Sequence, residues 1–200
     1  SNIAAVKLLD EAGPAEAKNV ASRFGIPFSQ TDSSLSMALG GMERGVTLPE
    51  LANAYRTLAN GGLYTPVSYY KNADRFPAVR TVCDDTAYLL TAMLQSCAAY
   101  GTAKKLKYSG YIAAKTGTNG DKNGNYDCYC VAYTKKHTVA VWFGAKDGGV
   151  IDNSVTGATA CGVIKSMIDD GAIDTDENFD MPQSVAYYEI DGKALNDTGE

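Results

Sequence analysis

Apolar residues in the first part of the chain recur with the period of an α-helix. Ile3, Val6 and Leu9 fall on one face of a helix predicted over Asn2–Ala12, which a Gly-Pro pair would end. A second helix is predicted over Pro14–Phe24, with its proline in the first turn, where the missing N–H costs little. The chain is therefore expected to open with two short helices joined by a tight connection.

Two further helices carry clear start and stop signals. The sequence Thr47-Leu48-Pro49-Glu50 is a capping box, and the helix that it opens would run past Leu58 to a Gly-Gly pair. Another helix is predicted over Asp84–Tyr100, which begins with two acids and is followed by glycine. Residues 26–46 are rich in Ser and Gly and predict a loop, and residues 63–82 predict irregular or short extended pieces.

Beyond residue 110 the pattern changes to that of strands. Three strands are predicted, over Tyr111–Thr118, Asp127–Thr134 and His137–Gly144. Only a short turn separates the last two, so they should form an antiparallel hairpin. The segment Asn119–Asn125 is dense in Gly, Asn and Asp, which predicts a loop between the first two strands.

One more helix is predicted over Gly157–Asp170, after the three strands. Helices, then a meander, then a helix give an α+β fold in which an antiparallel sheet of at least three strands is packed by helices. With 200 residues, the chain has room for one domain. We place that domain at residues 1–170 and an acidic C-terminal extension at 171–200, with a possible short strand at Val185–Ile190.

Charge is unevenly spread along the chain. Residues 169–200 hold ten acids and one base, a net charge of −9, whereas the other 168 residues hold 17 bases and 13 acids. This distribution predicts a solvated acidic tail on a mildly positive body. The sequence pI near 4.9 favours no nucleic-acid partner. No apolar run is long enough for a membrane helix, so any export signal or anchor is expected to lie outside these residues.

Five cysteines cannot all pair within one chain. Cys83 and Cys97 flank a predicted helix, which would hold them about 20 Å apart and beyond disulfide reach. Cys128 and Cys130 would point to one face of a strand. The cysteines are predicted to be packing residues. With one histidine, His137, in the chain, we expect no metal site.

Lys115-Thr116-Gly117-Thr118 ends a predicted strand and offers the groups that a peptide substrate needs. The hydroxyls of Thr116 and Thr118 could hold a carboxylate, and Gly117 would let another backbone approach closely. Lys115 supplies a cation that could join proton transfer when desolvated. In isolation, these four residues favour an ordinary strand over a binding site.

The surrounding sequence resembles the transpeptidase domain of class A penicillin-binding proteins. The resemblance covers roughly residues 2–170, in the family's order and with suitable spacing. It implies a partial β-lactamase/transpeptidase-like fold. The matching stretches are LSMALGG (35–41), GVTLPELANAYRTLANGG (45–62), YGTA (100–103), AKTGT (114–118), residues 131–134 and VAVWFG (139–144).

This family uses three motifs, S-x-x-K with the nucleophilic serine, S-x-N, and K-T-G. Lys115–Gly117 is the third. Asn2 and the apolar helix after it match the second from its Asn onward, which puts the motif's serine one position before residue 1; Ser1-Asn2 could instead be a cloning remnant. The first motif is expected upstream. Ser68-Tyr69-Tyr70-Lys71 also spells S-x-x-K, but it shows no helix signal and stands in the wrong order.

The resemblance implies a peptidoglycan D,D-transpeptidase, which cross-links stem peptides through an acyl-serine intermediate. Lys115 and Asn2 would be catalytic, and Thr116, Gly117 and Thr118 would bind substrate, with no metal and no cofactor. β-Lactams would acylate the same serine. Without that serine, these 200 residues alone should be inactive.

The resemblance also implies where the parent protein works and with what. We expect the extracytoplasmic face of a bacterial membrane, and as partners peptidoglycan stem peptides, β-lactam antibiotics and the missing N-terminal part of the same protein. Core left open by that missing part could drive self-association.

Two other interpretations stay open. The first is a hydrolase of the same fold, a D,D-carboxypeptidase or a serine β-lactamase. The second is a non-catalytic peptidoglycan- or partner-binding module. An S-x-x-K upstream would favour an enzyme, and its absence would favour the binding module.

Three other residues have ordinary interpretations. His137 should be a surface turn residue beside two lysines. Trp142 alternates with valines in an apolar strand and should belong to the core. Where the family usually has Trp in the second strand, this chain has Cys128 or Tyr129, so the packing there should differ.

Overall fold

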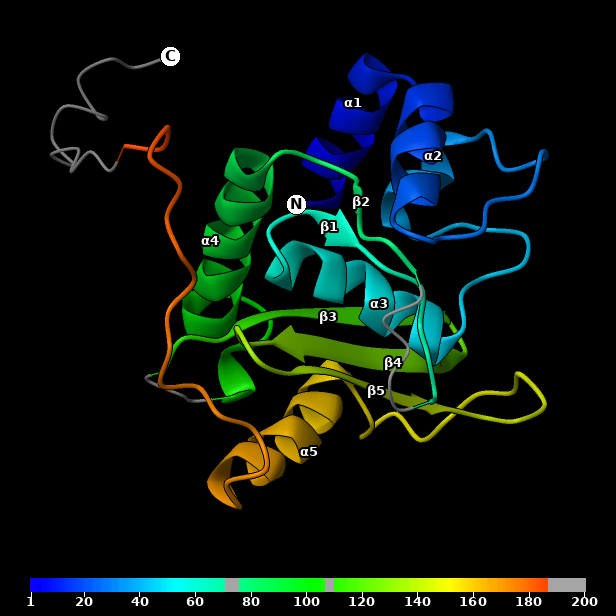
Figure 1. The fold of residues 1–200 in the computed structure, drawn as a ribbon. Coiled ribbons are helices and arrows are strands. Elements are labelled where there is room, and N and C mark those ends of the chain that lie inside the picture. The colour runs from blue at the N-terminus through cyan, green and yellow to red at the C-terminus, as the bar shows by residue number, and fades with distance from the viewer. Residues whose placement is uncertain (71–75, 107–109, 187–200) are drawn as a thin grey trace, which may run out of the picture.

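A computed structural model describes residues 1–70, 76–106 and 110–186 of the chain (Figure 1). Its N-terminal pair of helices is α1 (Asn2–Ala12) and α2 (Pro14–Arg23). Gly13 joins them with a φ of 82°, a left-handed conformation that glycine adopts without strain. Both predicted helices are confirmed. The loop after them contains one 3₁₀ turn, η1 (Leu35–Leu39), that the sequence analysis did not foresee.

The capping box opens α3 (Leu48–Ala59) as predicted. The Thr47 backbone N–H donates to Glu50 Oε2 at 2.8 Å, and the Glu50 N–H donates back to Thr47 Oγ1 at 3.4 Å. This hydrogen bonding, with the nearby Arg44, lowers the pKa of Glu50. The helix therefore begins where its unpaired N–H groups find acceptors.

Two short strands and a long helix follow. β1 (Leu63–Tyr64) and β2 (Val79–Arg80) form a two-stranded antiparallel ladder, which agrees with the short extended pieces predicted there. Next comes α4 (Asp84–Tyr100), with the bounds that the sequence predicts. A 3₁₀ turn, η2 (Lys104–Leu106), continues from it.

Three antiparallel strands form the central sheet in the order β3-β4-β5. Their bounds are β3 (Ala113–Asp121), β4 (Gly124–Tyr133) and β5 (Thr138–Gly144). The β4–β5 hairpin is confirmed. The loop predicted over Asn119–Asn125 is wrong, because both strands continue through it to a tight turn at residues 122–123. Asn and Gly there fit a bulged hairpin end rather than an open loop, and the register shifts between Asn119 and Gly120.

Helices cover both faces of this sheet, which gives the predicted α+β fold. α3 and α4 lie on one face, and α5 (Gly157–Asp169) lies on the other (Figure 1). The larger core lies between α5 and the sheet. Its most deeply buried residues are Ala103, Leu106, Ala114, Cys130, Ala132, Ala160, Cys161 and Ile164.

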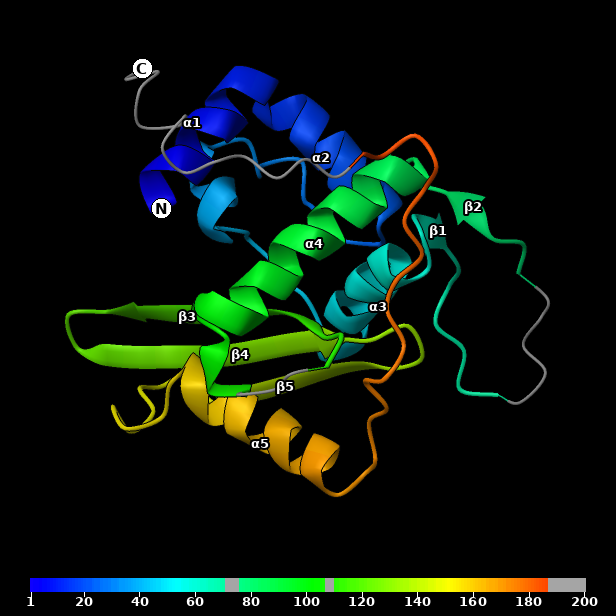
Figure 2. The same cartoon turned by 90° about the vertical axis from the view of Figure 1, so that its left-hand side faces the viewer.

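Residues 171–186 form a segment that we call the C-terminal strap, which returns from α5 to run beside α4 (Figure 1, Figure 2). The Tyr111 backbone N–H donates to the Thr175 carbonyl oxygen at 2.9 Å. Ile173 and Phe179 are 5% and 9% exposed. The prediction of a solvated tail is therefore wrong for these residues. Of the possible strand at Val185–Ile190, the first two residues are not in a strand and the others lie outside the described residues.

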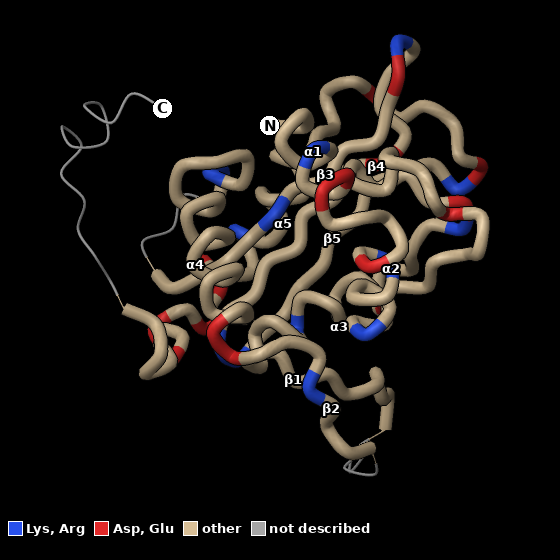
Figure 3. The backbone as a smooth tube through the Cα atoms, turned by 90° about the horizontal axis from the view of Figure 1, so that it is seen from above, with Lys and Arg blue, Asp and Glu red and all other residues tan. Residues whose placement is uncertain are grey.

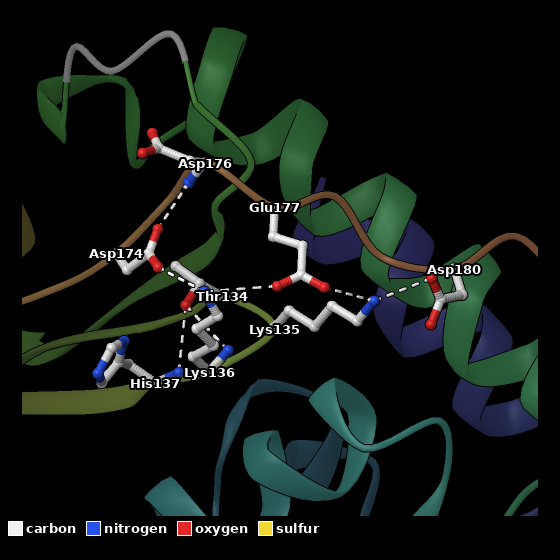
Figure 4. Close-up of polar contacts among 8 residues, drawn as sticks. All are labelled: Thr134, Lys135, Lys136, His137, Asp174, Asp176, Glu177 and Asp180. Carbon is white, nitrogen blue, oxygen red and sulfur yellow. Dashed lines mark hydrogen bonds and ion pairs between the residues drawn. The ribbon is translucent and has the colours of Figure 1, made fainter.

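Acidic residues of the strap bind the turn between β4 and β5. Lys135 pairs with Glu177 at 2.8 Å and with Asp180 at 2.9 Å, and Lys136 pairs with Asp174 at 2.7 Å (Figure 4). These contacts raise the pKa of both lysines and lower that of Asp174 and Glu177. Over the rest of the body, basic and acidic residues are interspersed (Figure 3).

An aromatic cluster holds the strap in place. The Phe179 ring meets the Tyr133 ring edge-on, with centroids 5.6 Å apart, and the Tyr55 ring centroid lies 6.1 Å from that of Tyr133. Burial raises the pKa of Tyr55 to about 12. The Tyr133 hydroxyl keeps a hydrogen bond with Thr91 Oγ1 at 3.0 Å. A buried aromatic anchor therefore supplements the exposed ion pairs.

Candidate active site

The Lys115–Thr118 motif lies in β3, at an edge of the three-stranded sheet (Figure 2). Ala113 and Ala114, just before it, are fully buried and fix the strand against the core. Lys115 is exposed, and its Nζ donates to the Thr116 carbonyl oxygen at 2.7 Å. Within the described ranges no other strand pairs with the outer edge of β3, so an extended peptide could approach it there.

A hydroxyl pair joins the motif to the segment that follows α4. Thr116 Oγ1 donates to Thr102 Oγ1 at 2.7 Å, and Thr102 Oγ1 lies 3.6 Å from Cys97 Sγ. Thr102 belongs to the YGTA stretch at 100–103. Two of the stretches that carry the family resemblance thus meet in space. Sequence reasoning gave Thr102 no role, although its place in one of those stretches was an available signal.

Gly157, the first residue of α5, packs directly behind Thr116. A Cβ added to Gly157 would lie 2.9 Å from the Thr116 Cβ, which is closer than real Cβ contacts. The Thr156 side chain caps this helix by accepting from the Ala158 N–H at 3.2 Å. Because Gly157 has no side chain, α5 can pack closely behind Thr116. Sequence reasoning missed this role of Gly157.

Gly117 and Thr118 complete the motif. A Cβ at Gly117 would meet the Tyr129 side chain at 3.5 Å, an ordinary contact, so this face of the strand is not crowded at Gly117. Thr118 is exposed and lies opposite Cys128 in the register. Burial raises the pKa of Cys128, and its hydrogen bond with Thr118 partly offsets that rise. The structure therefore brings Lys115, Thr116, Gly117 and Thr118 together on one accessible stretch of strand.

A polar group lies beyond the motif, near the far end of the hairpin. Asp127 accepts from the Trp142 indole N–H at 2.9 Å and from the Asn119 side-chain amide at 3.1 Å. Trp142 is 42% exposed, so its prediction as a core residue is wrong. Its ring covers Gly144, where an added Cβ would lie 2.2 Å away. Tyr129, rather than Trp, occupies the place on β4 beneath Gly117.

Asn2 is the first residue of α1 and is exposed. Among the contacts of the described residues, no hydrogen bond joins Asn2 to Lys115. Its assignment to the S-x-N motif stays a prediction.

The second S-x-x-K sequence has no helical start in the structure. Ser68 is exposed, and its Oγ accepts from the Tyr70 N–H at 3.2 Å in a stretch without helix. The lysine of this sequence, Lys71, lies outside the described residues. A nucleophile that opens a helix, as the family requires, is not found at Ser68.

The cysteines are all free thiols. Cys128, Cys130 and Cys161 are fully buried, as packing residues should be. The prediction is wrong for Cys83, which is exposed at the start of α4, where a hydrogen bond from Thr86 lowers its pKa. His137 is an exposed turn residue, as predicted. In the described ranges, no cluster of three His, Cys, Asp or Glu side chains could hold a metal ion.

Comparisons with known proteins agree with this arrangement. The chain matches the family described as "Penicillin binding protein transpeptidase domain" over residues 1–155. It is 34% identical over 156 residues to penicillin-binding protein 1F of Bacillus subtilis, which covers 72% of this chain and 22% of that protein. It is 27% identical to penicillin-binding protein 1A of Clostridium novyi, over 95% of this chain and 23% of that protein. The chain thus spans about a quarter of the length of these relatives.

Solved structures show the same fold. The PonA1 protein of Mycobacterium tuberculosis in complex with penicillin V superposes with a TM-score of 0.74 at 24% identity, over 90% of this chain and 56% of that one. The transpeptidase domain of penicillin-binding protein 3 from Burkholderia pseudomallei superposes with a TM-score of 0.62 at 22% identity, over 84% and 61%. The family match, the fold and the position of Lys115–Thr118 lead to one conclusion. The chain belongs to the penicillin-binding protein transpeptidase domain family.

Proposed function

We propose that this chain supplies the K-T-G side of a D,D-transpeptidase site that acts on the D-Ala-D-Ala end of a peptidoglycan stem peptide. The observation that carries the proposal is the exposed Lys115–Thr118 stretch on an edge strand. A substrate peptide would add to this edge as an antiparallel strand.

The reaction would proceed through an acyl-enzyme. A serine upstream of residue 1 would attack the carbonyl carbon of the penultimate D-Ala, and the terminal D-Ala would leave with the serine's proton on its amine. An amine of a neighbouring stem peptide would then take the acyl group and return a proton to the serine. Asn2 would hold a substrate amide, as the S-x-N motif implies.

Each residue of the motif would have its own role in binding the substrate. Lys115 would supply positive potential and connect to the S-x-N serine in the proton network. Thr118 would donate to the terminal carboxylate, and its backbone N–H would stabilise the oxyanion. Thr116 would join it by turning its hydroxyl hydrogen from Thr102 towards the substrate. Thr102 could then donate to Thr116, so the 2.7 Å pair would keep a hydrogen bond in both states.

The rest of the active site would come from protein outside these 200 residues, and the chain alone would be inactive. Large apolar side chains on α1, η1 and α4 stay exposed, which supports a missing packing partner; they include Ile3, Leu8, Leu39, Leu89, Met93 and Tyr100. The upstream part of the same protein would cover them. Without it, the chain would bury them by self-association.

We place this function outside the cytoplasmic membrane, where peptidoglycan is cross-linked. No helix among the described residues is long and apolar enough to cross a membrane.

The test is an assay of D-Ala release from an acyl-D-Ala-D-Ala peptide, with and without an amine acceptor. The enzyme is the protein extended upstream through its first S-x-x-K sequence. A cross-linked amide product that depends on Lys115 is the expected result. Release of D-Ala with hydrolysis only would assign a carboxypeptidase instead, and no release at all would favour a binding module.

A further inference from the structure

Two buried thiols lie in contact behind the K-T-G strand. Cys130 on β4 and Cys161 on α5 have their Sγ atoms 3.2 Å apart, and both residues are 0% exposed. The mechanism proposed above uses neither of them.

Their surroundings hold the two sulfur atoms in place. Cys130 lies opposite Thr116 in the strand register, and Gly157 of the same helix packs behind Thr116. Both cysteines belong to the larger apolar core, with Ile164 packed in the same cluster. Neither sulfur can turn to solvent without opening that core, so the two thiols stay next to each other for as long as the domain is folded.

The other cysteines are less suited to pairing. Cys128 faces the Val155 carbonyl oxygen, with its Sγ 3.4 Å away, and Cys83 and Cys97 contact threonine hydroxyls. A disulfide needs its sulfur atoms about 2 Å apart, which Cys130 and Cys161 could reach by small side-chain rotations. We propose that Cys130 and Cys161 form a disulfide that ties α5 to β4 behind the K-T-G strand.

Thiol–disulfide exchange with an external disulfide, such as glutathione disulfide or a protein disulfide, supplies the oxidant. The Cys161 thiolate attacks one sulfur of that disulfide, and the other sulfur leaves as a thiolate. The Cys130 thiolate then attacks the mixed disulfide at Cys161 and displaces the second external thiolate. The two cysteine protons end on the two released thiols, so the external disulfide is reduced to two thiols and one protein disulfide is formed.

In the folded protein, the hydrogen bond to Cys161 and burial raise the pKa of Cys130. The thiolate is the attacking species, so exchange is favoured before the two thiols become buried in contact. Because both residues are buried, external disulfides reach them while the chain folds rather than after it has folded.

The disulfide would close a loop between residues 31 positions apart, which contains β5 and the connection to α5. Cross-linking this loop restricts the unfolded chain and raises the unfolding midpoint. It would also hold α5 in place where its first residue, Gly157, packs behind Thr116. The thiol contact alone supports this disulfide. Its test measures no turnover, so it can fail without affecting the transpeptidase proposal.

The experiment starts from the reduced, denatured 200-residue protein, which is folded by dilution into a buffer of reduced and oxidised glutathione. Free thiols are then alkylated, and tryptic peptides are mapped by mass spectrometry. We expect a cross-link between peptide 123–135, which holds Cys128 and Cys130, and peptide 147–165, which holds Cys161. Fragmentation between residues 128 and 130 identifies the linked cysteine in the wild-type protein itself.

Matched variants sharpen the result. Cys128→Ser should keep the cross-link and Cys130→Ser should lose it. The oxidised wild type should unfold at a higher temperature than the same protein after reduction. Alkylation of both Cys130 and Cys161 in protein with a native circular dichroism spectrum would overturn the inference. A cross-link through Cys128 would overturn it as well.

Discussion

The helices on the two faces of the sheet, α5 and α4, differ in how much apolar surface they leave open. Ile164 and Ile168 of α5 are 0% and 6% exposed, and the return of the strap adds Ile173 to the same core. On α4, by contrast, Met93 and Tyr100 are 60% and 87% exposed. Both helices contact the same sheet, but α5 leaves one large apolar side chain exposed, Val163 at 40%, whereas α4 leaves several.

This difference shows which apolar surfaces the residues of this chain cover and which they leave exposed. On the α5 side, Ile173 of the strap joins the larger core, and Phe179 of the same strap fills the smaller core between the sheet, α3 and α4. The outer surface of α4 and the K-T-G edge leave apolar and polar groups accessible, which fits the proposal that they meet further protein and substrate. Substitutions at the K-T-G edge and in the two cores should therefore separate chemistry from stability.

The largest expected effect is on chemistry and comes from Lys115→Ala, tested in the protein extended upstream. Loss of the cation should slow acylation by benzylpenicillin by about 10²- to 10³-fold. The free energy of unfolding should change by less than about 0.5 kcal/mol, because Lys115 is exposed. Stopped-flow acylation and urea unfolding measure the two effects. Lys122→Ala, in the nearby hairpin turn, is the control and should alter neither.

In the core between the sheet, α3 and α4, Phe179→Ala should act in the opposite way. Removing this buried ring from Tyr133 should lower the free energy of unfolding by about 3 kcal/mol. The acylation rate of the protein that remains folded should be unchanged. Met181→Ala, at a position 51% exposed in the same strap, should cost less than about 0.5 kcal/mol. Equal losses from both variants in urea unfolding would mean that the strap has no apolar anchor.

Gly157 lies where α5 meets the K-T-G strand, so Gly157→Ala should affect both stability and acylation. The added Cβ would force α5 away from Thr116, which should cost about 1–3 kcal/mol of stability and slow acylation. Gly162→Ala in the same helix is the matched control, since its Cβ would meet nothing within 4 Å. It should stabilise the protein by about 0.5–1 kcal/mol. If both variants behave alike, α5 does not set the position of the motif.

The smallest expected effect concerns the ion pairs of the strap and pH. Lys136 and Lys135 lower the pKa of Asp174 and Glu177 in the folded protein. Their contribution to stability is therefore present above the unfolded pKa values, and it is lost as pH falls through the folded ones.

Thermal unfolding between about pH 6 and about pH 3 measures this contribution against a Lys135→Gln/Lys136→Gln variant. The difference in unfolding temperature between wild type and variant should shrink in acid. A difference that stays constant would show that these pairs do not couple the strap to the turn.

Local sequence signals predicted the helices well. The capping box at Thr47–Glu50 and the acid start and glycine stop of Asp84–Tyr100 act within one turn of the chain, so they can be recognised without the fold. The same holds for Lys115–Thr118, because its four residues are contiguous. Its family resemblance came from other contiguous stretches.

Features that depend on distant contacts were missed. The acids of the strap looked solvated because their partner lysines lie 38 to 45 residues away in the chain. Trp142 looked buried by alternation, but its indole N–H bonds to Asp127 on the neighbouring strand. Composition made 119–125 look like a loop, because a tight hairpin end uses the same residue types. The support of Thr116 by Thr102 and Gly157 likewise exists only in three dimensions.

We propose that these 200 residues hold the K-T-G part of a penicillin-binding site and that its nucleophile lies outside them. Intact-mass analysis after incubation with benzylpenicillin tests this directly, on the chain itself and on the protein extended upstream. We predict one covalent adduct per molecule on the longer protein and none on the 200-residue chain. An adduct on the short chain would contradict the claim and return attention to Ser68, and no adduct on either would favour a non-catalytic binding module.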